Sequence, residues 1–253
     1  MPGARSKHSR AATIAVVLLM ALLAYQLVVA VRAGLAELYA LPATRLMDQW
    51  QDAVDELEYT EEVFLPDETA WQGVLHNLER AAQLAPANPA YQAELGRLFQ
   101  FKLQDEALEV ETIEALNTTV LGHYQKAAYL RPTWPYYWWD IALAEYDSYH
   151  THTETYQEAL QNAARFGPWV TDVQHFVAEM SLETWESLDA ATRLVALDNF
   201  ERALQRQEDD VIDLFDDYDA WDSLCSNAGA GDPGLSSSYP NITTGCSDLN
   251  TEE

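Results

Sequence analysis

Only a few groups of residues in this chain have types and spacings that could do chemistry. His150 and His152, with Asp147 and Glu154 nearby, offer the imidazole and carboxylate ligands that zinc or nickel takes. They fall in a polar stretch between two expected helices, where such side chains are usually just solvated. We therefore predict no metal site here.

The acidic run at residues 209–222 contains enough carboxylates to attract calcium. It lacks the alternating aspartates and the sharp glycine turn that focus oxygen ligands on one ion, so diffuse association with counterions is the favoured interpretation. The chain also lacks a nucleophile elbow, an H-E-x-x-H helix, a phosphate loop and a glycine-rich dinucleotide turn. We predict no catalytic residue and no cofactor.

Aromatic residues are the strongest candidates for a binding surface. Residues 134–139 contain five rings in six positions, and rings of this kind stack on sugars while their polar tips bind hydroxyls. Five rings cannot all face one side of a helix, so some are expected at the surface; the alternative is that they pack the core. The candidate groove or glycan-stacking residues are Tyr91, Trp134, Tyr137, Trp138 and Trp169.

An internal repeat positions these aromatic residues. Each copy has a small residue five positions before a proline and a large apolar residue two positions before it. A looser fourth copy at residues 201–204 lacks the proline, and the unequal spacing indicates an insertion around residues 106–116. The three clearer copies are AAQLAP at 81–86, AAYLRP at 127–132 and AARFGP at 163–168.

The repeat predicts pairs of helices. Small residues let two helices approach closely, and the proline ends one helix before the next begins. Over residues 67–207 the pattern resembles a divergent tetratricopeptide repeat, although Tyr91, Leu95 and Gly96 match its first-helix signature only once. Apolar residues at helical spacing predict an all-α fold throughout. The resemblance implies that, after one N-terminal transmembrane helix, the chain forms an array of helical hairpins, an α-solenoid with a concave groove for a protein ligand.

A second resemblance is narrower. The block RPTWPYYWWDIALAEY at residues 131–146, with RFGPW at 165–169 and the apolar N-terminus, is similar to membrane-anchored VpsP-type accessory proteins of bacterial exopolysaccharide biosynthesis. Related patterns occur in the periplasmic tetratricopeptide tails of O-antigen-ligase-like proteins. This resemblance implies a non-enzymatic scaffold that holds a protein partner in an envelope polysaccharide assembly complex. Direct binding or modification of a glycan is the alternative.

One apolar segment near the N-terminus predicts a membrane anchor. Residues 11–31 carry no charge, and as a helix they would rise about 31 Å, which matches the hydrocarbon core of a bilayer. Arg5, Lys7 and Arg10 precede the segment and only Arg32 closely follows it. The positive side stays inside, so we predict a single-pass protein of the bacterial inner membrane with a cytoplasmic N-terminus and a periplasmic C-terminal domain. A cleaved signal peptide is the alternative, but this stretch exceeds the usual apolar region of ~7–15 residues.

The exported part is strongly acidic and contains both cysteines. It holds all 41 Asp and Glu residues, while four of the 14 Lys and Arg residues lie before it. Such a domain should be repelled by nucleic acid and by anionic lipid. It would attract cations or a basic partner, although solubility is the simpler interpretation. Cys225 and Cys246 bracket a loop rich in Gly and Ser in an oxidising compartment, which predicts one disulfide, with two free thiols as the alternative.

These features together predict six segments in chain order. They are a basic cytoplasmic tail (1–10), a transmembrane anchor (11–32), a juxtamembrane helical region (33–66), tetratricopeptide-like repeats (67–207), an acidic capping helix (208–224) and a disulfide-pinned C-terminal loop and tail (225–253).

Overall fold

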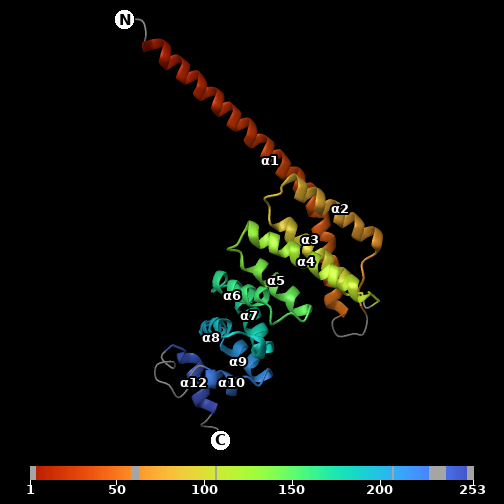
Figure 1. The fold of residues 1–253 in the computed structure, drawn as a ribbon, viewed down its shortest axis with the longest axis vertical. Coiled ribbons are helices and arrows are strands. Elements are labelled where there is room, and N and C mark those ends of the chain that lie inside the picture. Colours follow the sequence, from red (N-terminus) through yellow and green to blue (C-terminus); the bar gives the residue numbers. More distant parts are fainter. Residues whose placement is uncertain (1–3, 58–62, 106, 207, 228–237, 250–253) are drawn as a thin grey trace. The chain divides into compact units, whose positions relative to one another are not determined.

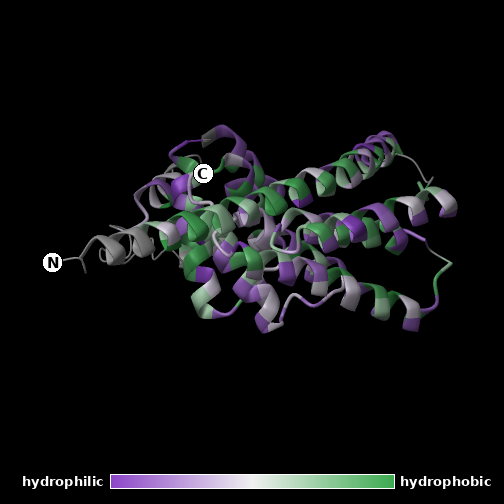
Figure 2. Cartoon of the chain, turned by 90° about the horizontal axis from the view of Figure 1, so that it is seen from above, coloured by the Kyte–Doolittle hydropathy of each residue, from purple (hydrophilic) through white to green (hydrophobic). Residues whose placement is uncertain are grey.

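The computed structural model describes residues 4–57, 63–105, 107–206, 208–227 and 238–249, and every regular element in these ranges is helical (Figure 1). The predicted all-α class is therefore confirmed. In Figure 2 the helices carry hydrophobic and hydrophilic residues side by side, as amphipathic helices do. The chain divides into two compact units, residues 1–105 and 106–253, which we describe separately.

The first unit consists of three helices, α1 (Ala4–Leu57), α2 (Glu68–Leu84) and α3 (Ala90–Leu103). The C-terminal part of α1 packs against α2 and α3. An edge-to-face contact between Trp50 and Phe101, with ring centroids 5.5 Å apart, joins α1 to α3. The core that these helices share consists of Ala43, Met47, Trp50, Trp71, Val74, Leu78, Leu95, Leu98 and Phe101.

The N-terminal part of α1 does not pack against the other described helices. Residues 12–35 are exposed on every side, and Leu18, for example, is 64 % exposed. By length and composition α1 is able to cross a membrane, because its most apolar stretch is long enough to span a bilayer and no part of that stretch is buried. Among the residues that the structure describes there is thus one candidate transmembrane helix, near the N-terminus, the first long helix of Figure 1.

The predicted boundary between anchor and juxtamembrane region is not a break in the structure. α1 runs through it without interruption, with Pro42 inside the helix, and ends at Leu57. The reason is packing, because the small residues Ala36 and Ala40 continue the helix as a buried stripe against α2 and α3. Residues 63–66, which we had included in the helical region, are not helical, and residues 58–62 lie outside the described ranges.

Arg32 joins the exposed part of α1 to the packed part of the first unit. Its guanidinium donates from Nε to the carbonyl of Leu84 at 3.0 Å and from Nη2 to the carbonyl of Gln83 at 3.1 Å. Both carbonyls belong to the last turn of α2, where backbone acceptors have no partner within their own helix and the helix dipole favours a cation. The residue expected only as a flanking charge therefore also caps α2.

The second unit contains the remaining helices. Consecutive helices from α4 to α9 pack against one another, and contacts also join α5 to α7, α6 to α8 and α7 to α9. These contacts lay the helices side by side in chain order. The elements are α4 (Val110–Leu130), α5 (Pro135–Asp147), α6 (Glu154–Phe166), α7 (Thr171–Glu183), the 3-10 turn η1 (Trp185–Ser187), α8 (Ala190–Leu204), α9 (Glu208–Asp217), α10 (Trp221–Asn227) and α12 (Pro240–Leu249).

The acidic segment at 208–224 forms two helices, where we expected one. A turn separates α9 from α10, and Asp219 in this turn has a positive φ of 48°. Aspartate tolerates this left-handed conformation better than most residues, because its short side chain bonds the local backbone. The turn lets the rings of Phe215 on α9 and Trp221 at the start of α10 meet edge to face at 5.1 Å.

The C-terminal segment 225–253 was expected to be a loop and tail, and part of that prediction is wrong. Residues 240–249 form α12, which packs against α8 and α10. The carboxylate of Glu201, a buried residue on α8, accepts hydrogen bonds from the backbone N–H groups of Asn241 and Ile242. It therefore caps the N-terminus of α12 from a distant part of the sequence, and this interaction is invisible in the local composition.

The predicted disulfide is confirmed. Cys225 on α10 is bonded to Cys246 on α12, with 5.8 Å between their Cα atoms. Gly245, beside this bond, lies so close to Trp221 that an added Cβ would come within 2.5 Å of the indole ring. Any larger residue at this position would therefore have to displace the Trp221 ring.

Candidate functional site

The three copies of the sequence repeat have the same backbone geometry at the helix junction. In each copy the first alanine is fully buried, and its carbonyl accepts from the N–H four residues later at 2.9–3.0 Å. A second bond then closes the turn into the next helix. The repeated pairs are Ala85 to Ala81, Arg131 to Ala127 and Gly167 to Ala163 for the first bond, and Asn88 to Ala85, Trp134 to Arg131 and Val170 to Gly167 for the second.

The third copy needs glycine where the others have larger residues. A Cβ on Gly167 would lie 2.7 Å from Cγ1 of Val173 and 3.0 Å from Cβ of Pro135. Val173 occupies the position that Tyr137 holds in the second copy. The variation between copies is therefore a packing adjustment around a constant junction.

The residue six positions after the motif proline makes the same hydrogen bond in the second and third copies, although it is a tryptophan in one and a glutamine in the other. In the second copy, Trp138 donates from its indole Nε1 to the carbonyl of Pro132 at 2.7 Å. In the third copy, the amide of Gln174 donates to the carbonyl of Pro168, also at 2.7 Å. An amide is thus sufficient for the junction. The tryptophan adds a large aromatic surface that the junction does not need.

Trp138 lines a hollow of about 490 Å³ between α4, α5 and α6, which we call the aromatic hollow. Tyr129, 84 % exposed, stands at its edge, and the aliphatic side chains of Ala128 and Ile141 also line it. Its polar lining consists of Gln125, Thr155 and Glu158.

A second hollow of about 330 Å³ lies between α6 and α8, which we call the arginine hollow because Arg165 and Arg202 line it. It is the repeat equivalent of the aromatic hollow, since its residues stand at corresponding positions of the next copy. The correspondences are Gln161 for Gln125, Ala164 for Ala128, Arg165 for Tyr129, Pro168 for Pro132, Val195 for Thr155 and Asp198 for Glu158.

The other predicted site residues are dispersed. Tyr137 is buried, and the Trp134 ring lies near it beneath the guanidinium of Arg131, 4.1 Å away. Trp169 is 61 % exposed and lines neither hollow. Tyr91 belongs to the first unit, where its ring is buried and its hydroxyl donates to Glu37 at 2.7 Å. Of the five, only Trp138 combines partial exposure with a place in one of these two hollows.

The residues that sequence reasoning missed are the partners of Trp138. Tyr129, Glu158, Arg165 and Arg202 were not singled out, because on their own they read as ordinary surface residues of helices. Comparison of the repeat copies position by position would have paired Tyr129 with Arg165 as a variable exposed position beside a constant proline. The sequence could have pointed to these residues through that comparison of the repeat copies.

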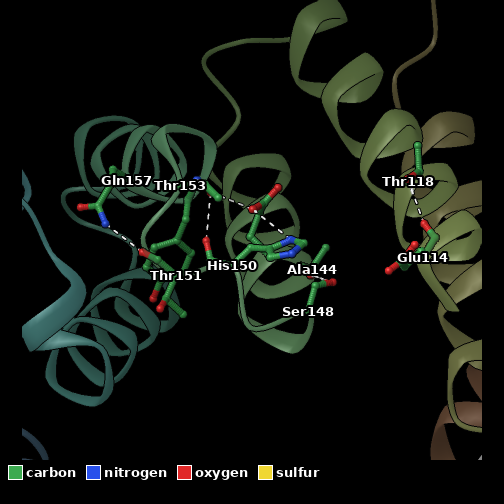
Figure 3. A network of polar contacts seen from close by, with 10 residues as sticks. Glu114, Thr118, Ala144, Ser148, His150, Thr151, Thr153 and Gln157 are labelled. Carbon is green, nitrogen blue, oxygen red and sulfur yellow. Dashed lines mark hydrogen bonds and ion pairs between the residues drawn. The ribbon is translucent and has the colours of Figure 1, made fainter. Parts of the chain in front are cut away.

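A polar network surrounds the connector between α5 and α6 (Figure 3). The buried carboxylate of Glu145 accepts from the hydroxyl of Thr153 at 2.8 Å and lies 3.9 Å from Nδ1 of His150. Gln157 donates to the carbonyl of Thr151 at 2.9 Å. These bonds give hydrogen-bond partners to polar groups of the connector and hold α5 against α6. Within the described ranges, no three His, Cys, Asp or Glu side chains converge on a point that could hold a metal ion.

A carboxylate on α7 links three helices of the second unit. Glu183 accepts from the hydroxyl of Tyr146 on α5 at 2.7 Å and from the hydroxyl of Tyr218, just after α9, at 2.8 Å. The two hydroxyls lower the pKa of the Glu183 carboxyl. The bond to Glu183 and burial raise the pKa of Tyr146 to about 12, and burial together with Glu183 raises the pKa of Tyr218 as well.

This link predicts a fold that weakens in acid. Because folding lowers the Glu183 pKa below its ordinary 4.5, the carboxylate stabilises the fold fully above that pH and loses its contribution as the pH falls below it. The raised pKa of Tyr146 affects stability at alkaline pH. The contribution of this hydroxyl to the stability of the fold is complete below pH 10 and is lost as the pH rises through about 12.

We expect Glu183→Gln to flatten the acid side of this dependence. The fall in urea midpoint of the full chain in detergent, between about pH 7 and about pH 4, should be smaller in the variant than in the parent. Glu186→Gln, which changes an exposed carboxylate nearby, should leave the fall unchanged. An identical fall in the parent and in Glu183→Gln would contradict the assignment.

Comparison of the chain with protein-family models, with curated proteins and with solved structures finds no match in any of the three.

Proposed function

We propose that this chain is a membrane-anchored helical-repeat scaffold on the periplasmic side of a bacterial inner membrane. It acts as an accessory protein in exopolysaccharide biosynthesis or export, and it works by holding a protein partner without catalysing a reaction. The observation that carries the proposal is the junction geometry repeated after α2, α4 and α6. A repeated junction of this kind builds a tetratricopeptide-like array whose extended surface suits a protein ligand.

The exposed segment of α1 supports the membrane anchor. A run of apolar residues this long, exposed on every side, is strongly favoured to leave water. The basic residues before it support a cytoplasmic N-terminus. The disulfide between Cys225 and Cys246 supports an oxidising compartment for the rest of the chain, because such bonds persist outside the cytoplasm.

The role in polysaccharide assembly rests on the aromatic block at residues 131–146 and its resemblance to exopolysaccharide accessory proteins. The experiment that tests it is an in-frame deletion in the host, which should lower the amount of exported polysaccharide. The full chain should restore the amount. A chain whose residues 1–31 are replaced by a cleavable export signal should not, since it reaches the periplasm without the anchor. Unchanged polysaccharide in the deletion strain would contradict the proposal.

A second candidate is direct binding or modification of the glycan, and the aromatic hollow is the observation that favours it. Trp138 and Tyr129 offer ring surface, and Gln125 and Glu158 offer hydrogen-bonding groups. Isothermal titration of the full chain in nanodiscs with the host polysaccharide separates the two candidates. The scaffold proposal expects no heat of binding, and the second candidate expects a saturable signal that Trp138→Gln abolishes.

A further inference from the structure

We infer that the two repeat-equivalent hollows together bind one extended segment of the partner protein, with an apolar side chain in the aromatic hollow and an acidic side chain in the arginine hollow. The inference rests on the proposed function, because it takes the ligand to be a protein. It adds the chemistry of the recognised segment and the residues that select it.

The aromatic hollow suits an apolar side chain. The junction bond to Pro132 needs only an amide, as Gln174 shows in the next copy, so the ring of Trp138 is surplus to folding. Beside this ring the hollow is lined by Ala128 and Ile141, which offer no hydrogen bond, and only Gln125, Thr155 and Glu158 line it with polar side chains. A sugar placed there would lose water from every hydroxyl that faces the rings and the aliphatic side chains, without compensation for that loss. A leucine, proline or aromatic side chain would lose nothing and would gain contact with two rings.

The arginine hollow suits an acid. Neither Arg165 nor Arg202 has a carboxylate within ion-pair distance among the described residues, although the chain carries a net charge of −27. Nε of Arg202 is buried and has no hydrogen-bond partner there. Asp198, which also lines this hollow, interacts with Tyr239. A carboxylate from a ligand would accept charge-assisted hydrogen bonds from these guanidinium groups.

The spacing of the hollows sets the spacing of the two side chains. Both hollows use α6: Thr155 and Glu158 line the first, and residues 161–165 contribute to the second. The offset along α6 is thus roughly 10 Å. An extended peptide covers about 3.3 Å per residue, so the apolar and acidic residues should stand about three positions apart, with two residues between them.

The test uses the full chain in nanodiscs and an array of blocked, fluorescently labelled peptides with a Gly-Ser background. Each peptide carries one leucine and one glutamate separated by zero to five residues, and matched peptides replace the glutamate by glutamine or the leucine by serine. Fluorescence anisotropy should show saturable binding that is tightest when two or three residues separate the leucine from the glutamate. The glutamine peptides should bind about fivefold more weakly and the serine peptides about tenfold more weakly.

Single substitutions assign each hollow its role. Trp138→Gln should keep the junction bond and the melting temperature of the parent but weaken binding about tenfold. Arg165→Gln should abolish the preference for glutamate over glutamine and leave the preference for leucine intact. Two controls should bind as the parent does: Tyr149→Asn, which removes an 89 % exposed ring outside both hollows, and Arg80→Gln, which removes an exposed cation of the first unit.

The inference is overturned if no peptide of the array binds at millimolar concentration, or if Trp138→Gln leaves the affinity unchanged and Arg165→Gln leaves the preference for glutamate unchanged. It is also overturned if oligosaccharides from the host polymer bind in a Trp138-dependent manner while the peptides do not. The proposed function fails separately, because its test measures polysaccharide in a deletion strain. If polysaccharide export depends on the chain but is unaffected by both substitutions, the scaffold proposal stands and the role of these two hollows is excluded.

Discussion

Removal of residues 1–31 should release the chain from the membrane completely. The full chain should sediment with membranes and resist extraction by alkaline carbonate, whereas the truncated chain should remain in the supernatant. The reason is the exposed apolar surface of α1, whose Leu, Ile and Val residues favour insertion by roughly 5 kcal/mol in total on an insertion scale. A difference of that size shifts the partition by more than about a thousandfold.

The truncation is placed so that the first unit keeps its fold. Arg32 must remain, because its guanidinium bonds the carbonyls of Gln83 and Leu84 at the end of α2. A matched pair in the full chain sharpens the result: Leu22→Arg should weaken retention, since a cation at mid-span costs about 2.5–3.5 kcal/mol, and Leu22→Phe should not. Carbonate-resistant membrane association of the truncated chain would show that another surface binds the membrane.

Replacement of Phe200 by alanine should destabilise the second unit more than any surface change. Phe200 on α8 is fully buried, with its ring centroid 5.2 Å from that of Phe215 on α9 and 6.4 Å from that of Trp185 in η1. Truncation leaves a cavity where three elements meet, and such losses amount to roughly 3–5 kcal/mol. Hydrogen exchange should report the loss as amide exchange in α8 and α9 that is at least about a hundredfold faster.

Leu194→Ala provides the control on the same helix. Leu194 is 54 % exposed, so its truncation should change the stability by no more than about 0.5 kcal/mol and leave exchange in α8 nearly unchanged. The comparison isolates burial, because both variants shorten an apolar side chain on α8. Similar exchange rates for the two variants would mean that the aromatic cluster contributes little to this unit.

The helical class and the repeat were predictable because their signals are local. Proline and small residues at fixed offsets define a junction within a few turns of helix, and the structure has the same two backbone bonds in each of the three copies. The disulfide was also predictable, because the chain has only two cysteines. These inferences need no knowledge of which helices meet in space.

The missed features all depend on partners distant in sequence. α12 begins where Glu201, forty residues earlier, accepts from the backbone of Asn241, and its Gly- and Ser-rich surroundings suggested a loop. The division of the acidic helix depends on Asp219 and on packing between rings. The two hollows are formed by α4, α5, α6 and α8 together, so neither Arg165 nor Tyr129 carries a signal of its own.

The unbroken course of α1 has a mechanical consequence. Residues 12–35 and the stretch that packs on α2 and α3 belong to one continuous helix. The hydrogen bond from Arg32 to the carbonyl of Leu84 also ties this helix to the end of α2. In the proposed membrane-anchored form, a span that tilts further in a thinner bilayer, as mismatched helices do, would tilt the first unit with it. We therefore expect the thickness of the bilayer to set the orientation of this unit relative to the membrane surface.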